Sequence, residues 1–141
     1  MATINPYLNF KGNTEEAFNF YKSVFGGDFS SLVRFKDMPA AGSVPSQDSD
    51  KLMHVALPIS KGNVLMGTDV LESKGQTLTP GDNFSLSISA ENKAEADKLF
   101  NISAGGNVEV PMSDAPWGSY FGMTKDKFGI RWMVNFDTPK N

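Results

Sequence analysis

The chain contains no cysteine and only one histidine, His54. Without cysteine it forms no disulfide, has no thiolate nucleophile and cannot build a metal site that contains cysteine. A reducing compartment is compatible with this composition, and we expect a cytoplasmic protein. One histidine per chain also cannot supply the two imidazoles of a 2-His-1-carboxylate metal site.

Long apolar runs and clusters of basic residues are missing too. No window approaches the roughly 18 apolar residues of a membrane-spanning helix, and residues 1–10 lack the basic start and apolar stretch of a secretory leader. Thirteen basic and sixteen acidic residues give a formal net charge of −3. We therefore expect neither a nucleic-acid nor a membrane partner, and small molecules are better candidates.

What is present is a weak internal repeat. Residues 12–29, GNTEEAFNFYKSVFGGDF, align with residues 91–108, ENKAEADKLFNISAGGNV. Each copy begins with polar residues, continues with apolar residues at helical spacing and ends in Gly-Gly, which supplies the positive φ that terminates a helix. We predict one short amphipathic helix in each copy.

Alternation with a period of two predicts strands on either side of each helix. The stretches are 3–10, 28–35, 51–60 and 63–70 around the first helix, and 83–90, 107–112, 120–125 and 130–136 around the second. This order is βαβββ, twice, and the chain has the length of one domain. We predict a single α+β domain over 1–141, with unit one at about 1–70, a linker at about 71–82 and unit two at about 83–137. The polar segment 36–50 is predicted to be a loop, either a surface excursion or a lid.

A duplicated βαβββ unit with these residues resembles the glyoxalase/bleomycin-resistance/extradiol-dioxygenase superfamily, also called the vicinal oxygen chelate fold, and within it the PhnB-like proteins. The resemblance is carried by PYLNFKGNTEEAFNFYKSVFGGDF (6–29), MHVALPI (53–59), NVLMGTD (63–69) and WGSYFGMTKDKFGIRWMVNF (117–136). It implies curved, cup-like mixed sheets and a homodimer. In many members of this superfamily, the cup holds a divalent metal that chelates two oxygens of the substrate.

The residues that this chain carries at the family's metal-ligand positions are not metal ligands. The resemblance places these positions near Asn5 or Pro6, Met66, Phe84 and Met133, where metal-using members have His, Glu or Gln. A thioether is too soft for such ions and a phenyl ring offers no lone pair. We therefore expect no cofactor and no divalent metal, and the alternative is an atypical site that uses His54, Asp69 and water.

Alternation also predicts which side chains face the cup. Leu8 and Phe10 are expected beneath the first helix, which turns Tyr7 and Asn9 toward the cup. On the last strand Trp132, Val134 and Phe136 are expected beneath the second helix, which turns Arg131, Met133 and Asn135 inward. For Arg131 the alternative to substrate binding is an ion pair with a carboxylate such as Asp126 or Asp137.

The remaining candidates have a structural alternative each. Met66, Phe84, Met123 and Met133 would line a polarizable, apolar cavity, or fill the core. Trp117 and Phe121 would form an aromatic lid, or pack within a turn. His54 would bind ligand or transfer a proton, or be an ordinary hydrogen-bonded strand residue. Asp69 would be a carboxylate near the cavity, or a turn residue at the end of its strand.

We predict a small-molecule-binding protein whose ligand is partly apolar or aromatic. The predicted binding residues are Tyr7, Asn9, His54, Met66, Phe84, Trp117, Phe121, Met133 and Asn135. One alternative is a lyase or isomerase that uses His54 or Asp69 as acid or base, with or without an atypical metal. A second alternative is a dimeric interaction module with a vestigial site, so whether the chain is an enzyme is left open.

PhnB-like proteins have often been labelled methyltransferases of a demethylated ubiquinone precursor, but this sequence does not support that activity. A Rossmann-type methyltransferase needs a glycine-rich turn between a strand and the helix that follows it. Here the glycine pairs in FGGDF (25–29) and AGGNV (104–108) follow the predicted helices instead.

Overall fold

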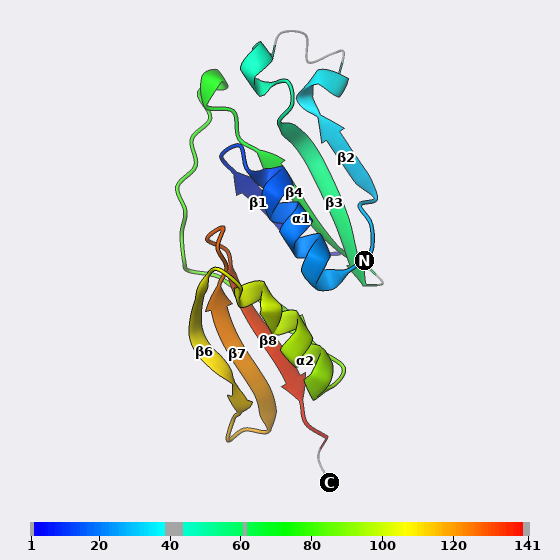
Figure 1. Cartoon of the computed structure of the whole chain (residues 1–141), viewed down its shortest axis with the longest axis vertical. Helices are drawn as coiled ribbons and strands as arrows, with labels where there is room; N and C mark the ends of the chain where they lie inside the picture. Colours follow the sequence, from blue (N-terminus) through cyan, green and yellow to red (C-terminus); the bar gives the residue numbers. More distant parts are fainter. Residues whose placement is uncertain (1, 39–43, 61, 140–141) are drawn as a thin grey trace. The chain divides into compact units, whose positions relative to one another are not determined.

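The structure is a computed structural model of the chain, and it describes residues 2–38, 44–60 and 62–139 (Figure 1). Contacts within the chain divide it into two compact units, Met1–Thr79 and Pro80–Asn141. The boundary falls inside the segment predicted as the linker, 71–82. Each unit contains the predicted βαβββ order, so the repeat in the sequence is a repeat of structure. That the two units form one domain stays a prediction.

In unit 1 a four-stranded mixed sheet carries one helix. Its elements are β1 (Tyr7–Phe10), α1 (Thr14–Phe25), β2 (Ser31–Arg34), β3 (Leu52–Ser60) and β4 (Asn63–Asp69), with short 3₁₀ turns η1 (Phe35–Asp37), η3 (Ser46–Asp48) and η4 (Glu72–Lys74). The strand order is β1-β4-β3-β2. Strands β1 and β4 are parallel, and the other neighbours are antiparallel.

Helix α1 covers one face of this sheet, as its amphipathic pattern predicts. Phe18 and Tyr21 are fully buried, and the Phe18 ring meets Phe10 of β1 edge-on at a centroid distance of 6.4 Å. A Cβ at Gly67 of β4 would lie 2.5 Å from the Phe18 ring, so glycine is required for this close approach. The helix ends at Gly26, whose φ of +80° confirms the predicted glycine stop.

The polar loop at 36–50 is anchored at its described ends. Arg34 donates two hydrogen bonds to the Glu15 carboxylate of α1, at 2.9 and 2.7 Å, and a third to the carbonyl of Asp50. The hydrogen bond from Arg34 lowers the pKa of the Glu15 carboxyl. Part of the predicted loop, 39–43, lies outside the described residues. The two alternatives for this loop, a surface excursion and a lid over a ligand, both stay predictions.

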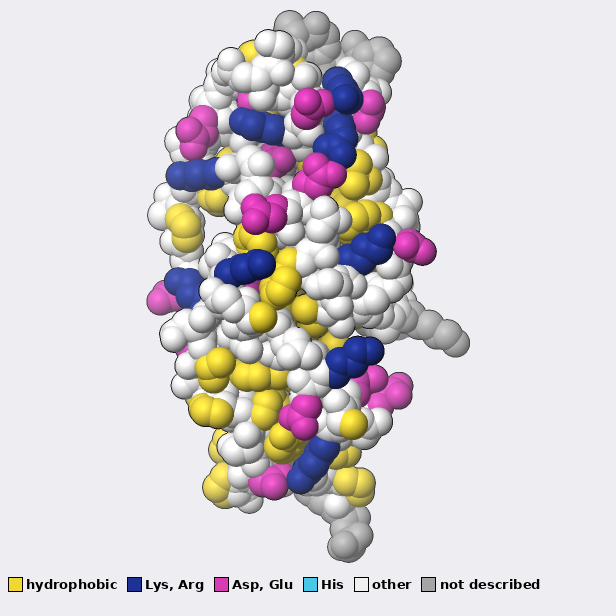
Figure 2. All heavy atoms as spheres, in the orientation of Figure 1, with side chains coloured by type: hydrophobic (Ala, Val, Ile, Leu, Met, Phe, Trp, Pro, Cys, Tyr) yellow, Lys and Arg dark blue, Asp and Glu magenta, His cyan; other side chains and the backbone are white. Residues whose placement is uncertain are grey.

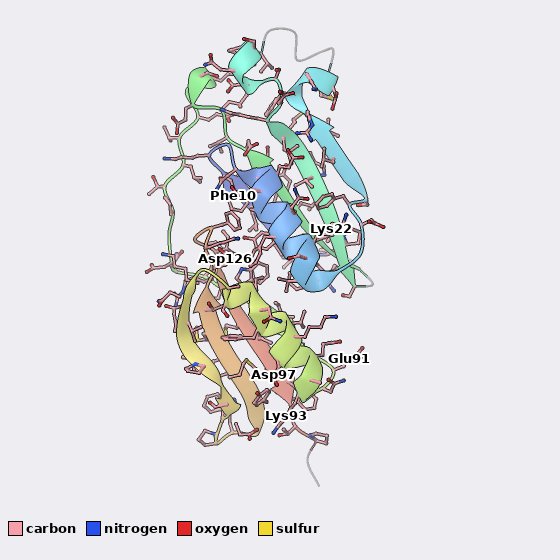
Figure 3. The ribbon with its side chains drawn as sticks, viewed as in Figure 1. Phe10, Lys22, Glu91, Lys93, Asp97 and Asp126 are labelled. Carbon is pink, nitrogen blue, oxygen red and sulfur yellow. The ribbon has the colours of Figure 1, made fainter. Side chains whose placement is uncertain are left out.

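Unit 2 repeats the arrangement with its own sheet. Its elements are β5 (Leu86–Ser89), α2 (Lys93–Leu99), a 3₁₀ turn η5 (Phe100–Ser103), β6 (Asn107–Asp114), β7 (Ser119–Lys125) and β8 (Arg131–Asp137). The strand order is β5-β8-β7-β6, with β5 and β8 parallel. Asp126, labelled in Figure 3, follows β7 and accepts hydrogen bonds from the backbone N–H of Phe128 and Ile130 and from Nε1 of Trp132. These bonds hold the β7–β8 connection in place.

The second helix differs from the prediction. It was expected to run up to Gly105-Gly106, but α2 ends at Leu99 and continues as the 3₁₀ turn η5. Asparagine, β-branched isoleucine and serine at 101–103 are poor helix formers, and Ile102 is fully buried from this tighter turn. Gly105 has the expected positive φ, +75°, whereas Gly106 does not. A Cβ at Gly106 would lie 2.3 Å from the Lys125 carbonyl, so Gly106 allows a close backbone approach.

Acidic and basic side chains are interspersed over the surface that Figure 2 shows, and no large basic patch appears among its described residues. No helix in the described part of the chain is both long and apolar enough to span a membrane.

Candidate functional site

The uncovered face of the unit 1 sheet brings together four of the predicted site residues. Strand pairing sets Tyr7 opposite Met66 and Asn9 opposite Thr68. Leu8 and Phe10, which alternate with them along β1, are buried at 4% exposure. The predicted alternation of β1 is therefore confirmed. On β3, Ala56 pairs with Met66, and His54 lies two residues away on the same face. Tyr7, Asn9, His54 and Met66 thus share one open face.

Tyr7 and His54 contact each other on this face. The Tyr7 hydroxyl lies 3.3 Å from Nδ1 of His54, and the ring centroids are 5.9 Å apart. Tyr7 is on β1 and His54 on β3, so the pair reaches across β4. In the tautomer that carries its proton on Nε2, Nδ1 of His54 accepts a hydrogen bond from the Tyr7 hydroxyl. The pair puts a phenol and an imidazole, two groups capable of proton transfer, on an accessible surface.

A cavity of about 530 Å³ opens at the carboxyl ends of β1 and β4. Its lining residues are Asn9, Phe35, Met53, Thr68, Asp69, Val70, Gln76 and Thr77. Phe35, Met53 and Val70 supply apolar walls, and the other residues supply polar groups. The volume lies in the range of small-molecule sites. Of the predicted residues, Asn9 and Asp69 line it.

The carboxylate of Asp69 has a structural role. Oδ1 accepts hydrogen bonds from the backbone N–H of Thr14 at 3.0 Å and from its hydroxyl at 2.6 Å, and Oδ2 accepts one from the backbone N–H of Leu52 at 2.9 Å. Asp69 is 3% exposed. A carboxylate that is fully engaged in holding α1 and β3 to β4 is poorly placed to accept a substrate proton. The geometry therefore favours the structural alternative for this residue.

A second cluster fastens the segment that follows β4 to the loop before β3. Asp48, which is 2% exposed, accepts hydrogen bonds from Lys51 Nζ at 2.7 Å and from the Ser73 hydroxyl at 2.5 Å. These two bonds, that from Lys51 first, lower the pKa of the Asp48 carboxyl. The same salt bridge raises the pKa of Lys51. The bond to Ser73 holds η4, and with it the chain that leads to Gln76 and Thr77 on the cavity wall.

The candidates in unit 2 form a separate group. Phe121 pairs with Asn135 and Met123 with Met133 on β7 and β8, and these four side chains lie on the face opposite to buried Trp132 and Val134. The predicted alternation of β8 is confirmed for Trp132 and Val134, which are buried, whereas Phe136 is only half-buried. The Asn135 amide donates to Asp137 at 3.1 Å.

The aromatic candidates of unit 2 are accessible. Trp117 is 68% exposed in the β6–β7 turn, and its ring meets that of Phe121 at a centroid distance of 5.9 Å. Phe84, 59% exposed, precedes β5 and is not paired in a strand. Strand alternation therefore does not fix the face of Phe84.

Arg131 pairs with a carboxylate, but not with one of those named from the sequence. Its guanidinium contacts Glu109 of β6 at 3.2 Å and donates to the carbonyl of Asp82 at 2.8 Å. Asp126 is engaged by its own turn and by Trp132, and Asp137 accepts from Ser119 and Asn135. The ion-pair alternative thus describes Arg131, with Glu109 as the partner.

The residues at the family's metal-ligand positions do not fit a divalent ion. Asn5 has an amide oxygen, and this oxygen accepts a hydrogen bond from the Val64 N–H at 3.0 Å. The carbonyl of Pro6 accepts from the Met66 N–H. Met66, Phe84 and Met133 add only thioethers and a phenyl ring. Among the described residues, no three His, Cys, Asp or Glu side chains are grouped so that they could hold a metal ion.

Sequence reasoning missed six of the cavity residues: Phe35, Met53, Thr68, Val70, Gln76 and Thr77. Thr68 could have been found, because it lies two residues after Met66 on the same strand and therefore on the same face of the sheet. Gln76 and Thr77 carried no signal, since they lie in a polar segment that was read as a linker.

Comparisons with known proteins find relatives that match most of the chain. A sequence model of the family described as 3-demethylubiquinone-9 3-methyltransferase matches residues 2–135. Protein YjdN of Escherichia coli (strain K12) is 28% identical over 139 residues, which cover 94% of this chain and 93% of YjdN.

Solved structures agree with this match. Protein PA1353 from Pseudomonas aeruginosa has a TM-score of 0.85 and 35% identity, over 99% of this chain and all of that chain (100%). A putative 3-demethylubiquinone-9 3-methyltransferase, PhnB protein, from Bacillus cereus has a TM-score of 0.74 and 27% identity, over 96% and 99% of the two chains. A glyoxalase/bleomycin resistance protein/dioxygenase family enzyme from Burkholderia phytofirmans PsJN, 17% identical with a TM-score of 0.60 over 93% and 96%, shares the fold.

Proposed function

Because the chain belongs to the PhnB-like family described as 3-demethylubiquinone-9 3-methyltransferase, within the glyoxalase/bleomycin-resistance superfamily, we propose that it binds a small, partly apolar or aromatic molecule. The observation that supports this most is the cavity of about 530 Å³ at the carboxyl ends of β1 and β4. Apolar walls with a few polar groups are typical of ligand sites, where the walls supply affinity and the polar groups orient the ligand.

The proposed binding does not depend on a divalent metal. The family's ligand positions carry amide, thioether and phenyl groups here, and the Asn5 oxygen already accepts a hydrogen bond from the Val64 backbone. Ligand affinity would come from burial of apolar surface against Phe35, Met53 and Val70.

The methyl transfer in the family's name is not part of the proposal. Rossmann-type methyltransferases bind their methyl donor at a glycine-rich turn between a strand and a helix of a parallel, doubly wound sheet. Here β1 is joined to α1 by Lys11-Gly12-Asn13, with a single glycine, and the sheet is mixed. Calorimetric titration with S-adenosylmethionine should give no binding heat. Saturable binding would reopen the methyltransferase assignment.

A second candidate is an acid/base enzyme, lyase or isomerase, and the Tyr7–His54 pair favours it. The imidazole is next to a phenol on an accessible face, and both can exchange a proton with a substrate. Once a converted substrate is found, the variant His54→Ala should abolish turnover and leave substrate binding detectable. Unchanged turnover would remove His54 from the mechanism.

Methionine-methyl NMR can test the proposed site. The chain has seven methionines, of which Met53 lines the cavity and Met112 contacts Gly122 in unit 2. Titration with 1-indanone, a small neutral aromatic ketone, should shift the Met53 signal and leave that of Met112 in place.

Variants at two exposed threonines provide the control. Thr77→Trp should block the titration, because Thr77 lines the cavity, whereas Thr79→Trp, two residues further along the chain, should not. A shift at Met53 that survives in Thr77→Trp, or no shift in the original chain, would count against this site.

We also propose a homodimer, as the family resemblance implies, and a cytoplasmic location, with which the absence of cysteine is compatible. Sedimentation velocity at micromolar concentration would show the mass of two chains, and a single-chain mass would contradict the dimer.

A further inference from the structure

Gln76 lines the cavity, and the backbone of Leu71 holds the oxygen of its side-chain amide. Its side-chain oxygen Oε1 accepts the backbone N–H of Leu71 at 2.7 Å, and its own backbone N–H donates to the Leu71 carbonyl at 3.3 Å. Leu71 is 2% exposed and anchors this short loop in the core of unit 1. Because an N–H requires an acceptor, the oxygen of the Gln76 amide must face Leu71. The NH₂ group is therefore the end that remains for a ligand.

The cavity offers little to an ion. Asp69 is the one ionisable residue among its described lining, and both of its carboxylate oxygens already accept hydrogen bonds from Thr14 and Leu52. The Thr68 hydroxyl donates to the Met53 carbonyl at 2.7 Å. A charged ligand would lose hydration here without gaining a partner of opposite charge.

We propose that Gln76 selects a neutral ligand that carries a carbonyl oxygen on an apolar ring. This inference rests on the proposed function and adds the ligand class and the residue that recognises it. The ring packs against Phe35, Met53 and Val70, and its carbonyl accepts from Nε2 of Gln76. A ligand without an acceptor at this point leaves the amide donor unpaired on burial, which lowers its affinity.

The substitution Gln76→Glu tests the donor while conserving shape. Glutamate keeps an oxygen for the Leu71 N–H and replaces the NH₂ group by a second oxygen, so a donor becomes a charged acceptor. Asn19→Asp is the matched control, because it adds the same charge at an exposed position of α1, away from the cavity lining. Two probes share one ring: 1-indanone, a carbonyl acceptor, and 1-aminoindane, a cationic donor at neutral pH.

Titration of the Met53 methyl signal gives the dissociation constant of each probe for the original chain, Gln76→Glu and Asn19→Asp. Thermal unfolding checks that each of these proteins is folded. In the original chain and in Asn19→Asp, 1-indanone should bind more tightly than 1-aminoindane. In Gln76→Glu the affinity for 1-indanone should fall about tenfold and the preference should reverse. A purely structural role for Gln76 would weaken both probes together.

The possible failures separate the two proposals. If 1-indanone binds at Met53 equally well in Gln76→Glu, or if both probes weaken together, the role of Gln76 is wrong and the cavity remains a ligand site. If neither probe shifts Met53 in the original chain, both the role of Gln76 and the proposed site are overturned.

Discussion

The Tyr7 hydroxyl on β1 lies 3.3 Å from Nδ1 of His54 on β3, so that the two side chains bridge β4 on the uncovered face of the first sheet. Tyr7 is 46% exposed. A hydrogen bond that water can replace contributes little to stability, and this contact is therefore available for a ligand at low cost.

Removal of the Tyr7 hydroxyl should accordingly change stability very little. For Tyr7→Phe we expect the free energy of unfolding to remain within about 0.5 kcal/mol of the original value, as is usual for exposed positions. Urea denaturation measures this difference. A loss well above 1 kcal/mol would mean that the pair holds the sheet together.

Substitution of Asp69, unlike that of Tyr7, should lower the free energy of unfolding markedly. Its carboxylate accepts three hydrogen bonds inside the first unit, one of them from the Leu52 N–H. In Asp69→Asn an NH₂ group would face a donor, either at Leu52 or at Thr14, and we expect a loss of about 2–4 kcal/mol in urea denaturation. The control Asp82→Asn, at an exposed position, should cost almost nothing. Full stability of Asp69→Asn together with a loss of ligand binding or turnover would restore Asp69 as a site residue.

The Asp48 cluster makes stability depend on pH. Hydrogen bonds from Lys51 and Ser73 hold the pKa of Asp48 below its ordinary value. A carboxyl whose pKa is lowered by folding stabilises the protein above its unfolded pKa of about 4, and this contribution is lost as the pH falls through the folded value. Asp48→Asn should therefore melt several degrees below the original chain at pH 7, and the gap should close in acid.

A matched control separates this effect from general charge effects. Asp28 forms an exposed ion pair with Lys22 at 3.3 Å, and Asp28→Asn should leave the melting temperature almost unchanged at every pH. If the gap for Asp48→Asn were the same at pH 7 and at pH 2, the ionised carboxylate would not be its cause.

Divalent ions should not stabilise the protein. An ion present at 100 times its dissociation constant would add about 2.7 kcal/mol to a protein that binds it only when folded. Because Asn5, Met66, Phe84 and Met133 provide no suitable free donor set, we expect no rise in melting temperature with an excess of manganese, nickel or zinc ions. A rise that is lost in His54→Ala would show an atypical metal site.

The resemblance to PhnB-like proteins and the α+β fold of paired βαβββ units were predicted from the sequence, and both are confirmed. Periodicity was sufficient because each sheet has one covered face. Burial beneath α1 forces Leu8 and Phe10 to alternate with Tyr7 and Asn9. The faces of β1 and β8 could therefore be assigned before the structure was known.

The cavity could not be predicted in the same way. Gln76 lines it because the Leu71 backbone captures its side chain, and no periodic pattern marks a bond of that kind. The partner of Arg131 was missed for a related reason. Asp126 is taken up by the N–H groups of its own turn, and Glu109 reaches Arg131 from a strand with an irregular register. The predicted end of α2 was wrong, because burial of Ile102 in the 3₁₀ turn η5 outweighs continuation of the helix.

The proposed ligand occupies the cavity between Asn9, Met53 and Gln76. The most direct measurement is a crystal structure with 5-bromo-1-indanone, whose bromine gives an anomalous signal that fixes its position. We expect a bromine peak between Phe35 and Met53 and the ketone oxygen within hydrogen-bonding distance of the Gln76 NH₂ group. A peak elsewhere, such as beside Trp117, with this cavity empty at saturating probe, would contradict the proposed site.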